Sequence, residues 1–355
     1  MSGAGAEELA ELVRIAADRP LSAHEAERAF TGVMEGLATP VQLAALLMAL
    51  RVRGATPAEL AGGVRALRAV MIPVPVADGL PVVDTCGTGG GSVPTFNIST
   101  AAALLAAASG VRIAKHGNRS FTSRSGSADV LEALGVVLEH PPERLAEILD
   151  RAGIVFMFAP LHHPAMRHAA PVRRELGLAT IFNLLGPLAN PAGTRRQVVG
   201  VADAAHQQLV ADGLRELGHE RALVVHGEPG LDELSPLAAT RVLELRGGEV
   251  SEWTFEPDSE LGWPTYHASD LAGGEPAENA AIVTGVLGGK VKGAARAAVA
   301  LNAAAAIYLA ELAPTLAEAV ALAEETLERG GGQQALERLR EESSRTAHEP
   351  PVSSA

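Results

Sequence analysis

The sequence contains little cysteine, no long apolar run and no excess of positive charge. Its 355 residues include one cysteine, Cys86, so no disulfide can form within the chain, which suits a reducing compartment. The longest apolar runs, such as 101–108 and 303–310, are much shorter than the roughly 18 residues that a membrane span needs. The first eight residues are small and acidic, which is not typical of a signal peptide. We therefore expect a cytoplasmic protein without a membrane partner.

Charge is distributed unevenly along the chain. There are 29 Lys and Arg against 42 Asp and Glu, a net charge of −13, whereas a nucleic-acid-binding protein would present a broad basic face. Residues 85–128 contain no Asp or Glu at all, although the average content of the chain would place about five there. The overall balance argues against a nucleic-acid partner, and the acid-free segment predicts a site for an anion.

The two familiar phosphate-binding glycine motifs are absent. A G-x-G-x-x-G fingerprint starting at Gly87 would need glycine at Ser92, and G-x-x-x-x-G-K-[ST] occurs nowhere. A glycine run, Gly87 and 89–91, nevertheless follows the predicted buried strand 81–84. Such a run is either a plain tight turn or a loop whose backbone N–H groups face a ligand. The acid-free surroundings favour a phosphate-binding loop.

Polar side chains continue this segment. Residues 97–100, Asn-Ile-Ser-Thr, begin an alanine-rich predicted helix, so first-turn amides and the positive end of its dipole lie near the glycine run. The next predicted strand delivers Lys115 and Arg119 at its end, and a further helix begins at Ser125 or Ser127. Two strand ends and two helix starts are therefore expected around one anion.

The rest of the chain predicts two domains of different kinds. Residues 1–73 read as helices with three capping boxes, Ser22 with Glu25, Thr39 with Gln42 and Thr56 with Glu59. Short β-rich runs then alternate with segments of helical length, at 82–85, 111–114, 154–159, 198–202 and 222–226. A hairpin around Gly247-Gly248 is expected at the sheet edge. This alternation predicts a parallel sheet with ligands at the carboxyl ends of its strands.

The predicted fold class is therefore α/β, with a small all-helical domain and a large domain whose central, mainly parallel sheet is flanked by helices. We place the small domain at 1–73, joined by helical residues near 165–190, the large domain at 76–345 and a disordered tail at 346–355. The apolar face of Val41, Ala44, Leu47 and Met48 is larger than a short helical domain buries easily. It predicts a contact with the large domain or with a second subunit.

Asp232 and Glu233 follow the predicted strand 222–226, at the same sheet edge as the glycine run. On a loop, adjacent carboxylates can both face a hard cation. Mg²⁺ is the natural candidate, because it binds through one or two carboxylates plus substrate phosphates. The alternative is an ordinary solvated turn.

Three other features have competing interpretations. Arg173 is either a clamp for a ligand carboxylate or a surface arginine on a helix. The histidines at 162, 163 and 168 lack nearby Cys or carboxylate partners, which disfavours a metal site there. Cys86 is either a nucleophile or a small buried residue at a strand end, and no neighbour in the sequence would activate its thiol.

Seven segments, taken in order, resemble the motifs of anthranilate phosphoribosyltransferases. They are 87–90, 95–100, 115–119, 125–129, 163–173, 182–191 and 230–234, and the resemblance covers about residues 8–340. It implies transfer of the 5-phosphoribosyl group from phosphoribosyl diphosphate to the amine of anthranilate, in tryptophan biosynthesis. It also implies a homodimer through the small helical domains and a pair of Mg²⁺ ions in each subunit.

The resemblance also implies a set of site residues. For phosphoribosyl diphosphate they are Gly87, Gly90, Gly91, Thr95, Asn97, Ile98, Ser99, Thr100, Lys115, His116, Gly117, Asn118, Arg119, Ser120, Phe121, Thr122, Ser123 and Ser127. For anthranilate they are Gly87, His116, Asn118, His163, Arg173 and Pro187. For the metal they are Ser99, Asp232 and Glu233. No protein nucleophile is implied.

One position departs from the family pattern. The residue after the double glycine is usually Asp in this family but is Gly91 here, which puts the tightness of metal binding in question. Two other functions stay open at this point. A pyrimidine nucleoside phosphorylase would share the fold plan without the Asp-Glu pair, and a noncatalytic nucleic-acid-binding relative would need more positive charge.

Overall fold

The computed structural model of the chain describes residues 3–77, 79–120 and 124–345. The first helices are α1 (Gly3–Asp18), α2 (Ala23–Met34), α3 (Pro40–Arg53) and α4 (Pro57–Val70). The strands are β1 (Val82–Gly87), β2 (Arg112–Gly117), β3 (Ile154–Phe158), β4 (Arg196–Gly200), β5 (Arg221–Gly227), β6 (Thr240–Arg246) and β7 (Glu249–Phe255). The other α-helices are α5 (Ile98–Ala108), α6 (Ser127–Ala133), α7 (Pro142–Ala152), α8 (Ala159–His162), α9 (Ala170–Leu176), α10 (Phe182–Leu188), α11 (Gln207–Glu216), α12 (Pro257–Leu261), α13 (Pro276–Leu287), α14 (Ala294–Leu309), α15 (Leu316–Glu328) and α16 (Gly331–Ser344). Short 3₁₀ helices lie at Pro164–His168, Ala204–His206 and Ala268–Leu271.

The N-terminal helices begin where the sequence predicts. Ser22, Thr39 and Thr56 each accept a hydrogen bond from the backbone N–H three residues later, at 3.2, 3.2 and 3.3 Å. The side chain at that later position bonds back to the cap in each case, so all three capping boxes are confirmed. Helix α3 ends at Arg53, with Gly54 as its C-cap. These local signals fix the start of α2, α3 and α4.

The strands of the described chain form one sheet in the order β3-β2-β1-β4-β5-β6-β7. Neighbours from β3 to β5 are parallel, whereas β6 and β7 form an antiparallel hairpin at the edge. The predicted α/β class with a mainly parallel sheet is therefore confirmed, as is the edge hairpin. The strand order reverses between β1 and β4, so a ligand crevice is expected at the carboxyl ends of these two strands.

Strand β2 is longer than the sequence pattern suggests. The apolar run stops at Ala114, but His116 and Gly117 continue the parallel pairing with β3. The reason is that Lys115, the charged residue that interrupts the pattern, is 3% exposed and lies within the fold. His116 and Gly117 therefore belong to the strand end instead of the following loop.

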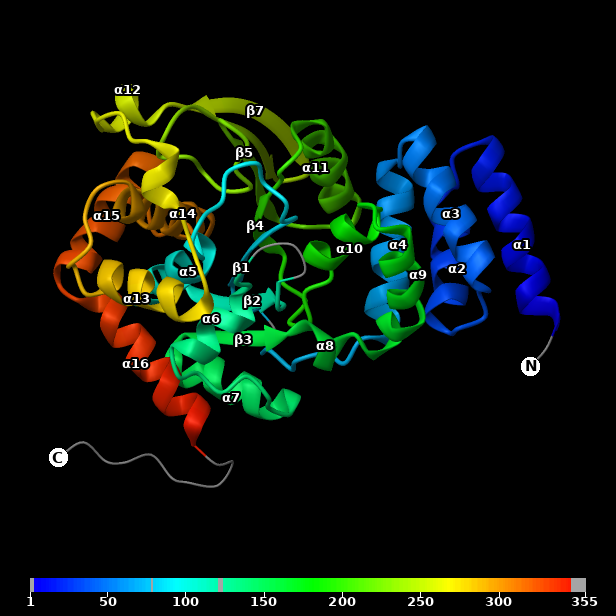
Figure 1. Ribbon diagram of the computed structural model, residues 1–355, viewed down its shortest axis with the longest axis horizontal. Helices are drawn as coiled ribbons and strands as arrows, with labels where there is room; N and C mark the ends of the chain where they lie inside the picture. The colour runs from blue at the N-terminus through cyan, green and yellow to red at the C-terminus, as the bar shows by residue number, and fades with distance from the viewer. Residues whose placement is uncertain (1–2, 78, 121–123, 346–355) are drawn as a thin grey trace.

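Two apolar cores flank the sheet, and Figure 1 shows the corresponding layers. One core joins the sheet to the alanine-rich helices α5 and α14 and to α6, α7, α13, α15 and α16. The other joins α1–α4, α9, α10 and α11 to the opposite face. Along β5 the side chains alternate, with Leu223 and Val225 in the first core and Ala222 and Val224 in the second. The helical bundle thus packs against the sheet through α10 and α11.

The apolar face predicted on α3 is divided between the interior and the surface. Leu47 is fully buried, and Ala44 and Met48 are partly buried. Val41 and Val52 are 79% and 81% exposed. The face is therefore only partly used by the fold of one chain.

No helix of the described residues is long and apolar enough to span a membrane. Helix α15 ends at Glu328, and Gly330, which has a left-handed backbone, directly precedes α16. The predicted C-terminal tail, 346–355, lies outside the described residues.

Candidate functional site

Two carboxylates from the loop after β5 lie at the carboxyl ends of β1 and β4. Asp232 Oδ2 accepts a hydrogen bond from the Gly89 N–H at 2.8 Å. Glu233 Oε1 accepts one from the Ser99 N–H at 3.2 Å. The pair is therefore located between the glycine run and the first turn of α5, which is the placement that the strand-end argument predicts.

Glycines at three strand ends make room for this loop. An added Cβ would lie 2.5 Å from Asp232 Oδ2 at Gly87, 1.7 Å from Asp232 O at Gly200 and 2.5 Å from Glu233 O at Gly227. These three residues end β1, β4 and β5. The sequence argument selected Gly87 but missed Gly200 and Gly227. Glycine as the last residue of a strand, a sign of close backbone approach, is the signal that would have identified them.

Lys115 is buried beside the acidic pair. Its Nζ donates to the backbone oxygen of Thr85 and lies 3.3 Å from Ser99 Oγ. Burial lowers the pKa of Lys115, whereas the charges of Asp84 and Glu233 raise it. The ammonium group is thus held within the fold, next to the Ser99 hydroxyl, instead of extending into solvent.

The acidic pair has the chemistry of a site for a divalent cation. Burial raises the pKa of Glu233 to about 8, and the neighbouring Asp232 charge adds to this rise. Burial also raises the pKa of Asp232. A bound cation would favour the ionised form of both groups. The two carboxylates and the Ser99 hydroxyl are hard oxygen donors of the kind that Mg²⁺ prefers, so the residues present fit this ion.

These donors do not make a complete metal site by themselves. Within the described residues, no group of three or more His, Cys, Asp or Glu side chains could hold a metal ion. Mg²⁺ characteristically keeps several waters and binds through one or two carboxylates plus substrate phosphates. A cation here would therefore need a phosphate-bearing ligand to complete its coordination.

The first turn of α5 faces the same place. Ile98 is buried and begins the helix, and Ser99 provides the N–H that Glu233 accepts. Thr100 is also buried, and its hydroxyl has no hydrogen-bond partner within the described chain. The helix start thus presents backbone amides and the dipole's positive end to the strand ends.

Asn97 is the N-cap residue of α5, but its side chain makes no cap hydrogen bond. Its Nδ2 donates to Ser125 O at 3.1 Å, and its Oδ1 accepts from Asn279 Nδ2 at 2.9 Å. Asn97 therefore ties the segment before α6 to α13. Thr95 lies two residues earlier, with its backbone oxygen against Gly273.

The glycine run uses its conformational freedom at two positions. Gly89 and Gly90 have φ of 70° and 82°, a left-handed backbone that favours glycine. An added Cβ at Gly91 would lie 3.0 Å from Gly230 O and 3.4 Å from Asp232 Oδ1. A side chain at this position would therefore project toward the acidic pair.

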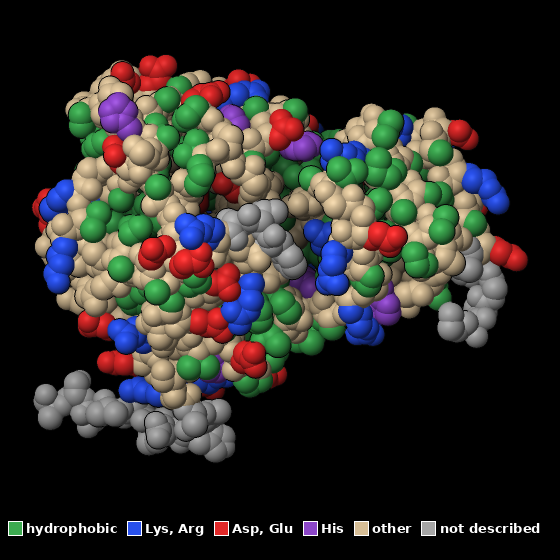
Figure 2. Space-filling view, in the orientation of Figure 1, with side chains coloured by type: hydrophobic (Ala, Val, Ile, Leu, Met, Phe, Trp, Pro, Cys, Tyr) green, Lys and Arg blue, Asp and Glu red, His purple; other side chains and the backbone are tan. Residues whose placement is uncertain are grey.

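The segment after β2 has its positive charge neutralised by carboxylates. Arg119 pairs with Asp129 at 3.0 Å and also with Glu132, and Arg124 pairs with Glu275 at 2.9 Å. Figure 2 shows the same mixture, with basic and acidic side chains next to one another on the border of the larger lobe that faces the smaller lobe. Arg119, which the sequence places at the end of β2, is therefore paired with carboxylates of α6 in this structure.

The residues on either side of Arg119, Asn118 and Ser120, are hydrogen-bonded to the start of α6. Asn118 O accepts a hydrogen bond from Ser127 Oγ at 3.2 Å, and the Ser120 N–H donates to Asp129. A Cβ at Gly117 would lie 2.3 Å from Ser127 Oγ. Phe121, Thr122 and Ser123 lie outside the described residues.

His116 of β2 and His163, which follows α8, lie together, and Pro187 of α10 is bonded to Gln197 of β4. The rings of His116 and His163 have centroids 5.0 Å apart. Burial lowers the pKa of His163 to about 4 and that of His116 well below its usual value, so both rings are neutral near pH 7. Pro187 O accepts a hydrogen bond from Gln197 Nε2 at 2.6 Å, and the same amide donates to the buried Asp84 at 3.0 Å. Gln197 thus links α10 to β1, a contact that the sequence did not indicate.

Arg173 lies on α9, and its guanidinium is 5.1 Å from the centre of the Phe182 ring. The side chain is partly buried, and burial lowers its pKa. Among the described residues it has no ion pair, unlike Arg119, and no hydrogen bond joins it to the glycine run or to the acidic pair. It is therefore a cation beside the core of the helical bundle, and its charge is not balanced by the described part of the fold.

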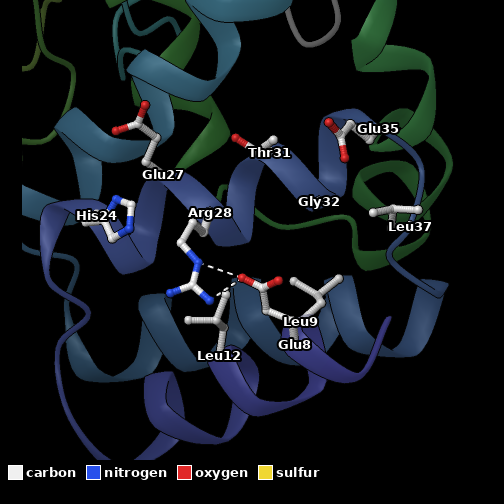
Figure 3. Close-up of a pocket in the computed structure, with 10 residues that line it drawn as sticks. All are labelled: Glu8, Leu9, Leu12, His24, Glu27, Arg28, Thr31, Gly32, Glu35 and Leu37. Atoms are coloured by element: carbon white, nitrogen blue, oxygen red, sulfur yellow. Dashed lines mark hydrogen bonds and ion pairs between the residues drawn. The ribbon is translucent and has the colours of Figure 1, made fainter. Parts of the chain in front are cut away.

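A separate pocket of about 300 Å³ lies in the N-terminal helices (Figure 3). Leu9 and Leu12 of α1 line one side, and Glu8 of α1 forms an ion pair with Arg28 of α2. None of the predicted site residues lines this pocket.

Comparison with known proteins gives consistent matches along the chain. A family model described as glycosyl transferase family, helical bundle domain, matches residues 9–71. A second, described as glycosyl transferase family, a/b domain, matches residues 79–333. The anthranilate phosphoribosyltransferase of Rubrobacter xylanophilus is 52% identical, over 92% of this chain and 95% of that protein.

Two solved structures are similar over nearly the whole chain. Anthranilate phosphoribosyltransferase from Thermus thermophilus has a TM-score of 0.89 and 45% identity, and covers 94% of this chain and 99% of that one. The protein from Saccharomyces cerevisiae, in complex with PRPP and Mg, has a TM-score of 0.86 and 26% identity, with 95% and 98% covered.

Proposed function

The chain belongs to the anthranilate phosphoribosyltransferase family, and from this membership we propose that it transfers the 5-phosphoribosyl group of phosphoribosyl diphosphate to the amine of anthranilate. The products are N-(5-phosphoribosyl)anthranilate and diphosphate, in tryptophan biosynthesis. The observation that carries the proposal is the acidic pair Asp232 and Glu233, bonded to Gly89 and Ser99 beside the buried Lys115. A nucleoside phosphorylase, the nearest alternative, would not need this pair.

The phosphates of the donor substrate bind the glycine run, the first turn of α5 and the segment that begins at Lys115. Backbone amides at a helix start and at left-handed glycines provide donors for phosphate oxygens without bringing a second charge. Ser99, Asp232 and Glu233 hold Mg²⁺, which when bound neutralises diphosphate charge and makes it a better leaving group. A pair of ions in each subunit is part of this proposal.

Anthranilate binds between α9 and the carboxyl ends of β1 and β2, where Arg173 orients its carboxylate. The guanidinium has no ion pair among the described residues and lies over the Phe182 ring, which leaves its planar fork free for bidentate contact with a carboxylate. The neutral rings of His116 and His163 and the nearby Pro187, Gly87 and Asn118 complete the acceptor side. Neutral rings can pack offset or edge-to-face against an aromatic acceptor.

The reaction needs no nucleophile from the protein. The only cysteine is partly buried, and burial raises the pKa of the Cys86 thiol well above its usual value. Its sulfur accepts a hydrogen bond from Gln197 at 3.3 Å. These observations favour the structural interpretation of Cys86, and the chemistry depends on positioning and on charge stabilisation.

Three features of organisation complete the proposal. The chain divides into a helical domain at 1–73, joined by residues near 165–190, and an α/β domain at 76–345. It forms a homodimer through the helical domains, and it acts in the cytoplasm without a nucleic-acid partner. The exposed Val41 and Val52 on α3 support the dimer.

The direct test measures the loss of anthranilate fluorescence when phosphoribosyl diphosphate and Mg²⁺ are added to the purified chain. We expect turnover that stops when EDTA removes the metal and returns when Mg²⁺ is restored. Phosphorolysis of thymidine or uridine, measured in parallel with inorganic phosphate, serves as the control for the alternative function. Nucleoside cleavage without anthranilate consumption would overturn the proposal.

A further inference from the structure

Helix α14 contains one buried polar residue that contacts the loop of the acidic pair. Its sequence is rich in alanine, and Asn302 is 4% exposed among apolar neighbours. Asparagine is a poorer helix former than alanine, and a buried amide is unfavourable unless it is hydrogen-bonded. Its presence at this position therefore needs an explanation from its contacts.

Those contacts use the whole side-chain amide. Asn302 Oδ1 accepts a hydrogen bond from the Leu234 N–H at 2.9 Å, and Nδ2 donates to Leu234 O at 2.9 Å. The second hydrogen of Nδ2 is donated to Ala298 O, one turn earlier in the same helix, at 2.9 Å. Asn302 thus binds both peptide groups of one residue, as a neighbouring strand would.

Leu234 directly follows Asp232 and Glu233. Within the described chain, its backbone N–H and C=O have no partner other than Asn302. The acidic pair is also held by Gly89 and Ser99 through its side chains. Asn302 therefore holds the backbone of the residue that directly follows the pair, whereas the next N–H, that of Ser235, is donated to Thr240 Oγ1 at 2.9 Å.

From this geometry we infer that Asn302 is a positioning residue for the divalent cation, acting through Leu234 on Asp232 and Glu233. The inference rests on the proposed function, since it assumes that the pair binds a metal. Residues 232–234 belong to no strand, so the loss of the two Leu234 hydrogen bonds would loosen the backbone that carries the two carboxylates. Contacts behind metal ligands commonly change affinity by about tenfold to a hundredfold.

The test compares Asn302→Leu with Asn302→Asp, which keeps the acceptor for Leu234 N–H but loses the donor to Leu234 O. Gln207→Met is the matched control, because Gln207 is another buried amide that donates to backbone oxygens, those of Val224 and Arg241. Binding of Mn²⁺ in the presence of diphosphate is measured by electron paramagnetic resonance. Urea unfolding and steady-state kinetics are measured on the same samples.

We expect both Asn302 variants to bind Mn²⁺ about tenfold or more weakly and to need more Mg²⁺ for half-maximal rate, with the KM for anthranilate within about twofold of wild type. Gln207→Met should lose stability and keep its Mn²⁺ affinity. Unchanged Mn²⁺ affinity in either folded Asn302 variant would overturn the inference. A wild-type chain that neither binds Mn²⁺ with diphosphate nor consumes anthranilate would instead overturn the proposed function.

Discussion

Arg173 and Lys115 are both cations of the candidate site, but the fold holds them differently. Lys115 is buried and donates to Thr85, with Asp84 and Glu233 nearby. The Arg173 guanidinium lies over Phe182 and has no ion pair among the described residues. Lys115 is therefore part of the internal charge balance, whereas Arg173 is available for a ligand carboxylate.

Replacing Arg173 with alanine should affect one substrate far more than the other. Hydrogen bonds to a charged group contribute about 1.5–3 kcal/mol, so the KM for anthranilate should rise by about tenfold to a hundredfold. The KM for phosphoribosyl diphosphate should change by less than about threefold. Arg174→Ala is the control, because this neighbour on α9 is exposed. Equal changes in both KM values would contradict the assignment of Arg173 to the acceptor.

His219 makes a pH-dependent contribution to stability that is separate from the site. Its side chain is 6% exposed, and burial together with the charge of Arg68 lowers its pKa to about 3. The unfolded chain binds the proton near pH 6.5, so the unfolded state holds more protons between these values. Stability is therefore present above pH 6.5 and is lost as the pH falls toward 3.

The variant His219→Phe should reduce this dependence. Between pH 6.5 and 5, its free energy of unfolding should fall less steeply than that of wild type, by up to about 1.4 kcal/mol for each pH unit. Urea unfolding at several pH values measures the two slopes. The difference between the two proteins should be constant above pH 7.5, where neither state binds the proton. Parallel curves over the whole range would show that His219 is not the group responsible.

At the scale of elements, the acidic loop and the ends of three strands depend on one another. The loop after β5 passes so close to β4 that a Cβ at Gly200 would lie 1.7 Å from Asp232 O. That contact is with backbone, so no side-chain rotation can relieve it. The position of Asp232 is therefore determined by the absence of a side chain on another strand.

Gly200→Ala should displace the loop and destabilise the protein. Overpacking of this kind usually lowers the free energy of unfolding by about 1–3 kcal/mol. The shifted carboxylates should also bind Mg²⁺ more weakly, so that turnover needs a higher Mg²⁺ concentration for its half-maximal rate. Gly32→Ala in α2 is the matched control. Its Cβ would meet only ordinary contacts, at 3.8 Å from Leu9, and alanine favours a helix interior. If Gly200→Ala has the wild-type free energy of unfolding and the wild-type Mg²⁺ requirement, the close contact between Gly200 and Asp232 is contradicted.

The elements that the sequence predicted well are those with signals a few residues apart. Ser22, Thr39 and Thr56 are each three residues from their capping partner, so a local pattern was sufficient. The strand-end rule placed the acidic pair correctly, because parallel strands share one edge.

Contacts between distant segments were not predictable in this way. Asn302 is hydrogen-bonded to Leu234, 68 positions away in the sequence, and nothing near Asn302 in the sequence indicates this contact. The sequence places Arg119 in a segment that has no acid, and nothing in that segment indicates that Glu132 on the following helix pairs with it. An absence of charge within a segment therefore says little about the charges that the fold brings to it.

At the scale of the whole molecule, α3 has more apolar surface than one chain covers. Val41, Ala45, Met48 and Val52 lie on one side of the helix, because their spacings of four, seven and eleven residues return to nearly the same angle. Val41 and Val52 are 79% and 81% exposed, and Leu178, in the segment after α9, is 48% exposed. Arg51 of α3 donates to Ala179 O, so this segment lies against the same helix. Together these residues form a candidate interface on the helical lobe in Figure 1.

A charged residue in this interface should separate the subunits without unfolding them. At micromolar concentration we expect wild type to have twice the mass of one chain in light scattering or sedimentation. The variant Val52→Asp should have the mass of one chain, since burying an unpaired carboxylate at an interface is strongly unfavourable. Val137→Asp is the control, because Val137 is 45% exposed in the segment between α6 and α7 of the other lobe and should leave the mass unchanged. If wild type is monomeric at this concentration, the proposed dimer is wrong, and the exposed face of α3 needs another partner.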